Sequence, residues 1–93
     1  MILEFIMPAY PTAKVLEYNK DSGQALVLLE NGILRIGNQI EIVGESGSTY
    51  RQELTSILLD KKPLYEVTSG SRVLIKLDKA PKINTSVSKI VGE

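Results

Sequence analysis

The stretch Leu34-Arg35-Ile36-Gly37-Asn38-Gln39-Ile40-Glu41-Ile42-Val43-Gly44 decides the fold. A glycine followed by an asparagine supplies the positive φ angles of a tight turn, because both residues tolerate a left-handed backbone. After this turn, isoleucines alternate with polar residues from position 39 to position 42, which predicts a strand with one buried face. The second glycine then ends the run. We expect a turn that leads into a strand of a small barrel, with Gly37, Asn38 and Gly44 as its structural turn residues.

Alternation and turn chemistry recur along the rest of the chain. The segments that carry these signals are residues 12–18, 24–30, 39–43, 49–59, 72–78 and 85–91. Residues 19–23 read Asn-Lys-Asp-Ser-Gly, which is the composition of a hairpin turn. In the longest segment the alternation slips at Thr55 and Ser56, and such a slip predicts a β-bulge or a bend. Residues 60–70 are expected to form a connection.

Six short strands at about ten-residue spacing, with turns between them, predict an all-β domain. We expect a six-stranded antiparallel Greek-key barrel that closes on itself, because closure removes exposed edge strands. An up-and-down sandwich is the structural alternative. The side chains that the period-two pattern places inside are Val15, Val27, Ile40, Ile42, Leu54, Val73, Ile75 and Leu77.

Composition narrows the chemistry that the chain can perform. The chain has 93 residues, of which 43% are apolar, so one domain can form a core without disulfides or metal. Cysteine and histidine are both absent, which removes thiol nucleophiles, the common zinc sites and the usual general base near neutral pH. The carboxylates of Asp60, Glu66 and Asp78 lack the spacing of a catalytic constellation. We expect a protein that is not an enzyme and that holds no metal or cofactor.

The charges cancel in number but are unevenly distributed. Residues 1–59 contain four bases and seven acids, whereas residues 60–93 contain seven bases and four acids. On a strand, Arg72 and Lys76 point the same way, and the following loop brings Lys79 and Lys82 near them. These four residues form our predicted basic patch, which suits an anionic partner such as RNA. The alternative reading is a solvated surface of mixed charge.

The chain starts with an apolar segment from Met1 to Met7. It lacks the basic start of a signal peptide, and no apolar run approaches the length of a membrane span. We expect residues 1–11 to form an arm or extra strand, and residues 12–93 to form the single barrel domain. The arm either covers its own barrel or joins two chains into a homodimer. The absence of cysteine and of a membrane segment favours a cytoplasmic protein.

The order and spacing of these motifs resemble a known family over about residues 13–90. The motifs that carry the resemblance are Gly37-Asn38-Gln39-Ile40-Glu41, Gly44 with Gly47, Tyr50-x-Gln52 and Leu77-Asp78-Lys79. They resemble the second domain of translation elongation factors such as elongation factor Tu. They are more similar to the C-terminal barrel of the collagenase-like peptidases of family U32. The turn usually carries Asp in that family where this chain has Asn38, and residues 65–71 also depart from its pattern.

The resemblance implies a binding role rather than a catalytic one. In the peptidase-like family the chemistry belongs to a much larger N-terminal domain, and in elongation factors the equivalent barrel contacts the acceptor end of aminoacyl-tRNA. The expectation is therefore a non-catalytic accessory module that binds RNA or a protein partner, such as a larger catalytic subunit. The alternative is a protein-interaction or self-assembly module without a nucleic-acid role. Because one fold serves many functions, the resemblance alone does not transfer an activity.

Overall fold

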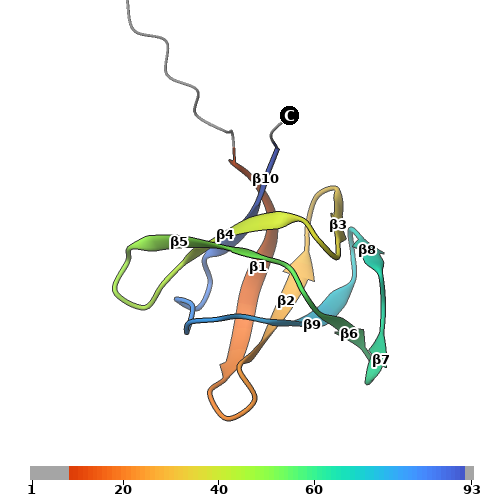
Figure 1. The fold of residues 1–93 in the computed structure, drawn as a ribbon, viewed down its shortest axis with the longest axis horizontal. Coiled ribbons are helices and arrows are strands. Elements are labelled where there is room, and N and C mark those ends of the chain that lie inside the picture. The colour runs from red at the N-terminus through yellow and green to blue at the C-terminus, as the bar shows by residue number, and fades with distance from the viewer. Residues whose placement is uncertain (1–8, 92–93) are drawn as a thin grey trace, which may run out of the picture.

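The computed structural model describes residues 9–91, and every regular element within them is a β-strand (Figure 1). The strands are β1 (Ala9–Asn19), β2 (Gln24–Leu29), β3 (Ile33–Arg35), β4 (Gln39–Val43), β5 (Thr49–Glu53), β6 (Ile57–Leu59), β7 (Lys62–Pro63), β8 (Glu66–Thr68), β9 (Arg72–Lys76) and β10 (Ser86–Ile90). The all-β prediction is confirmed. Of the arm predicted over residues 1–11, residues 1–8 lie outside the described residues and residues 9–11 belong to β1.

Eight of the strands form one antiparallel sheet, in the order β5-β4-β10-β1-β2-β9-β6-β7. The prediction of a closed six-stranded barrel is wrong, because this sheet does not close. The segment predicted as one long strand breaks between Glu53 and Ile57, at the expected bend, and its two halves become β5 and β6. Figure 1 shows β5 running on into β6 across the molecule. Among the described strands, β5 pairs only with β4, so the sheet has edges at β5 and at β7 and stays open between them.

A side chain bridges this opening where the backbone does not. The Nε2 atom of Gln52 on β5 donates to the carbonyl oxygen of Lys76 on β9 at 3.0 Å, and its Oε1 atom accepts from the amide of Asp78 at 2.7 Å. These two backbone groups flank one residue of the strand, so the amide occupies the place of a neighbouring peptide group. Gln52 is only 7% exposed, and a buried amide is tolerated when its donors and acceptors are satisfied.

The hydrophobic core lies inside the curved sheet and agrees with the predicted pattern. All eight side chains selected by period two are buried. The core also contains Ala13, Ala25, Leu29, Leu34, Ile57, Val67 and Val87. Two of these additions come from the smaller β3–β8 ribbon, in which Leu34 pairs with Val67. The prediction placed β8 within the connection of residues 60–70 and assigned no strand to residues 33–35, because three-residue strands are too short to show a clear alternation.

The strand β1 is longer and less regular than predicted. It begins at Ala9 and includes Pro11, which pairs with Ser88 of β10. Its register shifts between Pro11 and Ala13 against β10, and between Val15 and Glu17 against β2. Such bulges accommodate a proline, which cannot donate to the ladder, and they increase the twist of the strand. The strong twist lets one sheet wrap around the core.

Candidate functional site

The predicted turn residues act in three different ways. Gly37 has a φ of +97°, as expected for the left-handed position of a turn. Asn38 does not adopt a positive φ; its Oδ1 atom accepts from the amide of Arg35 at 2.8 Å and so holds the turn closed. Gly44 is buried, and a Cβ atom there would lie 3.2 Å from the carbonyl oxygen of Ser48. Gly44 is therefore needed for close packing of the hairpin rather than for an unusual φ.

The four residues of the predicted basic patch lie in two separate settings. Arg72 and Lys76 are the exposed first and last residues of β9 and share its outer face, with half-buried Leu74 between them. Lys79 and Lys82 lie in the loop that follows β9. The backbone amide of Lys82 donates to the carbonyl oxygen of Val43 at 2.8 Å, which ties this loop to the end of β4.

Lys79 contacts the ring of Tyr50 on β5. Its Nζ atom lies 5.6 Å from the centre of the Tyr50 ring, within the range of a cation–π contact. The Oη atom of Tyr50 donates to the carbonyl oxygen of Lys79 at 2.5 Å. Burial raises the pKa of Tyr50 to about 12. This contact joins β5 to the loop after β9, so Lys79 has a local role in addition to its charge.

The outer face of β1, β2, β9 and β6 carries side chains in three parallel rows, because residues paired across antiparallel strands share a face. The middle row joins Glu17, Leu26, Leu74 and Leu58 by their strand pairing. The row on one side is Lys14, Leu28 and Arg72. The row on the other side is Asn19, Gln24 and Lys76. We call Leu26, Leu74 and Leu58 the apolar row; all three are half-buried although they point away from the core.

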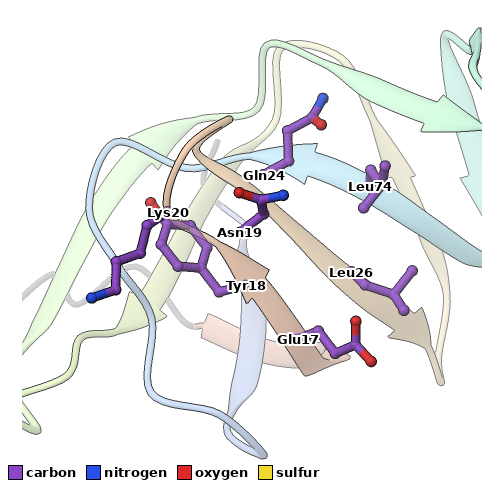
Figure 2. Close-up of a pocket in the computed structure, with 7 residues that line it drawn as sticks. All are labelled: Glu17, Tyr18, Asn19, Lys20, Gln24, Leu26 and Leu74. Carbon is purple, nitrogen blue, oxygen red and sulfur yellow. The ribbon is translucent and has the colours of Figure 1, made fainter.

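Two hollows lie on either side of the Leu26–Leu74 pair. Figure 2 shows the first, with Leu26 and Leu74 side by side on neighbouring strands. It measures about 440 Å³ and is lined by Glu17, Tyr18, Asn19, Lys20, Gln24, Leu26 and Leu74. The second hollow, of about 370 Å³, is lined by the apolar row together with Leu59, Asp60, Lys61, Arg72 and Val73. The outer face is therefore an aliphatic ridge between two shallow depressions.

Bases outnumber acids around this ridge. The charged residues in the three rows and the two hollows are Lys14, Lys20, Lys61, Arg72 and Lys76 against Glu17 and Asp60. The ion pairs within residues 9–91 are Arg35–Glu66 and Arg51–Glu41, each with a 3.0 Å contact. Both pairs lie on other strands, so the five bases have no ion-pair partner among the described residues.

Sequence reasoning missed the apolar row as a binding feature, although its signal was visible. Residues 25–29 read Ala-Leu-Val-Leu-Leu and barely alternate, as expected when a strand has apolar neighbours on both faces. Leu74 lies two residues from both Arg72 and Lys76, so alternation places it on the same outer face. The register between the strands aligns leucines from β2, β9 and β6 into one row, and this register cannot be predicted from the local pattern of one strand.

No group of three or more acidic or other ligating side chains within residues 9–91 is placed to hold a metal ion. In the same part of the chain, no helix is long and apolar enough to cross a membrane.

Comparison with solved structures finds the same fold in a domain of a larger protein. One crystal structure of the C-terminal domain of the "putative U32 peptidase" of Geobacillus thermoleovorans matches with a TM-score of 0.73 and 20% identity, over 97% of this chain and all of that domain. The selenomethionine variant of the domain matches with a TM-score of 0.73 and 22% identity, over 85% of this chain and 96% of the other. No protein-family model and no curated protein sequence matches the chain. The predicted resemblance to the U32 C-terminal domain is thus confirmed at the level of the fold.

Proposed function

We propose that this protein is a non-catalytic accessory module that binds a protein partner through the outer face of β2, β9 and β6. The apolar row carries this proposal. Leu26, Leu74 and Leu58 lie in one line on the outside of the sheet, and contiguous aliphatic surface with charged margins is typical of protein interaction sites. The structural likeness to the C-terminal domain of a larger chain supports an accessory role, with a larger catalytic subunit as the natural kind of partner.

RNA binding through Arg72, Lys76, Lys79 and Lys82 is the competing proposal. The apolar row favours the protein partner. Leu74 lies between Arg72 and Lys76 on β9, so an RNA backbone that contacts both basic residues would have to cross an aliphatic side chain. Single-stranded nucleic acid binds best to surfaces where exposed aromatic rings alternate with basic side chains. The outer face instead presents aliphatic side chains, and Tyr50 is held against the loop by Lys79.

Affinity capture from a cell lysate, with and without nuclease, tests the proposed function. The test compares the wild-type protein with Leu74→Thr, which removes aliphatic surface but keeps a residue suited to a strand. Ile83→Thr is the matched control, since Ile83 is 42% exposed in the loop before β10 and lies off the outer face.

We expect a discrete partner that resists nuclease and that is retained by the wild type and by Ile83→Thr but lost by Leu74→Thr. Denaturant unfolding of all three proteins verifies that they are folded at the assay temperature. Capture that nuclease abolishes would support RNA instead, and equal capture by all three proteins would overturn the assignment of the outer face.

A further inference from the structure

The charges around the apolar row indicate which kind of partner segment covers it. Building on the proposed function, we infer that the outer face of β2, β9 and β6 binds an acidic amphipathic α-helix, which lies across the strands along the apolar row. The helix places its apolar stripe on Leu26, Leu74 and Leu58, and its acidic margins reach the bases on both sides.

The dimensions of the face select a helix. The middle row runs from Glu17 of β1 to Leu58 of β6, so it crosses three strand spacings, or about 14 Å, and the apolar row takes up two of them, or about 10 Å. The flanking rows lie two residues away along each strand, about 7 Å to either side. A helix is about 10–12 Å wide with its side chains, so it fits between the basic rows and covers the ridge with two to three turns.

An extended segment would use the same face less well. In a strand, successive side chains point to opposite sides, so a segment that turned its apolar residues to the ridge would turn its acids away from the protein. In an amphipathic helix the charges flank the apolar stripe on both sides, which is where Lys14 and Arg72 lie on one margin and Lys76 lies on the other. The two-sided placement of these bases therefore favours the helical mode of recognition.

Charge complementarity makes the helix acidic. The face carries five bases and two acids, and the five bases have no ion-pair partner within residues 9–91. An acidic partner gains favourable potential on both margins, whereas a basic helix would be repelled. A second copy fits poorly for two reasons: it would oppose like charges, and its described residues contain no helix to donate.

Three synthetic peptides of about five helical turns test the inference. The first has a leucine stripe flanked by Glu, the second has the same stripe flanked by Lys, and the third keeps Glu but replaces the stripe by Gln. Their binding is measured by fluorescence anisotropy at about 50 mM salt, where Coulomb effects are weakly screened. We expect the first peptide to bind and both others to bind about tenfold or more weakly.

Charge reversal then locates the site. The double variant R72E/K76E should lose the Glu-flanked peptide and gain the Lys-flanked one. The matched control K79E/K82E changes the net charge equally but alters the loop after β9, so it should leave the preference unchanged. Analytical ultracentrifugation of the free protein, run alongside, should show no dimer that depends on Leu74.

The outcomes separate this inference from the function on which it rests. If Leu74→Thr loses its captured protein but the peptides show no preference for Glu, the face binds a protein of other chemistry and the inference is overturned alone. Equal effects of the two double variants would overturn it as well, because the response would then follow net charge. A Leu74-dependent dimer would assign the face to a second copy and overturn the acidic helix.

Discussion

The two halves of the sheet, β10-β4-β5 and β2-β9-β6, carry different side chains on their outer faces. On β10, β4 and β5 the outer row contains Ser88, Glu41 and Arg51, and the last two form an ion pair with a 3.0 Å contact. On β2, β9 and β6 the equivalent row consists of leucines flanked by bases. The two charges of the first row pair with each other. The second leaves both aliphatic surface and positive charge without a partner among the described residues.

Under the proposed function, this difference separates strands whose outer face serves stability alone from strands whose outer face also serves binding. Both halves share one core and the same alternation of inward residues, so folding alone does not require leucines on the outside of β2 and β9. A polar outer row such as that of β4 and β5 is compatible with the same fold and carries less risk of aggregation. The leucine row therefore supports the proposed interaction.

The largest expected effect concerns the connection between the two halves. Gln52→Ala removes the amide that bridges β5 to β9 and leaves the Asp78 amide and the Lys76 carbonyl without that partner. Because unsatisfied buried groups retain their desolvation cost, we expect a loss of about 2–4 kcal/mol in unfolding free energy. Urea denaturation measures this loss.

The neighbouring variant Glu53→Ala provides the control, since Glu53 is exposed on the same strand and should change stability by less than about 0.5 kcal/mol. If the two variants unfold at the same midpoint, the bridging amide contributes nothing, and the β1–β10 ladder and the shared core are enough to hold the halves together.

Much of this comparison was predictable from the sequence, and the reason is periodicity. Alternation selected eight inward residues, and all of them are buried. The bend after Glu53 and the left-handed Gly37 were also predicted, because a slip in alternation and a glycine in a turn are local signals. Local chemistry therefore determined the core and its main turns.

Features that depend on long-range register were not predictable in the same way. The order of the strands, which leaves β5 and β7 as the two edges of an open sheet, depends on long-range pairing that no local pattern reveals. The basic patch was predicted from the spacing of Arg72 and Lys76 on one strand, but the chemistry between them depends on Leu26 and Leu58 from other strands. Whether that patch binds RNA stays a prediction.

The next prediction concerns the turn before β4. It tests whether this turn contributes more to the unfolding free energy than the surface ion pair between β4 and β5. Gly37 precedes β4 at a φ of +97° with no atom within 4 Å of a Cβ built on it, so the cost of a side chain there is backbone strain without a clash. Gly37→Val should lower the unfolding free energy by about 1–3 kcal/mol. Gly37→Asn should cost clearly less, because asparagine tolerates this conformation. An unchanged denaturation midpoint for the valine variant would contradict the assigned turn.

A smaller effect compares the two outer faces directly. Leu74→Thr removes half-buried aliphatic area and should cost about 1 kcal/mol, whereas Arg51→Thr removes an exposed ion pair and should cost about 0.5 kcal/mol or less. Retention on a hydrophobic-interaction column should fall for Leu74→Thr and should stay unchanged for Arg51→Thr. The reverse ranking in either measurement would mean that the leucine row is not the more adhesive of the two faces.

The smallest expected effect appears only at alkaline pH, at the contact between β5 and the loop after β9. Burial raises the pKa of Tyr50 from 10.0 to about 12 in the folded protein, so between these values the unfolded chain has lost a proton that the folded protein still holds. Stability therefore falls as pH rises through this window.

Tyr50→Phe also loses the hydrogen bond to the Lys79 carbonyl, and that loss does not vary with pH below 10. The difference in unfolding free energy between wild type and Tyr50→Phe should thus be constant from pH 7 to 9 and should shrink as pH rises toward 12. A difference that stays constant up to the alkaline limit would show that Tyr50 ionises alike in both states, and that water reaches the contact between the two halves.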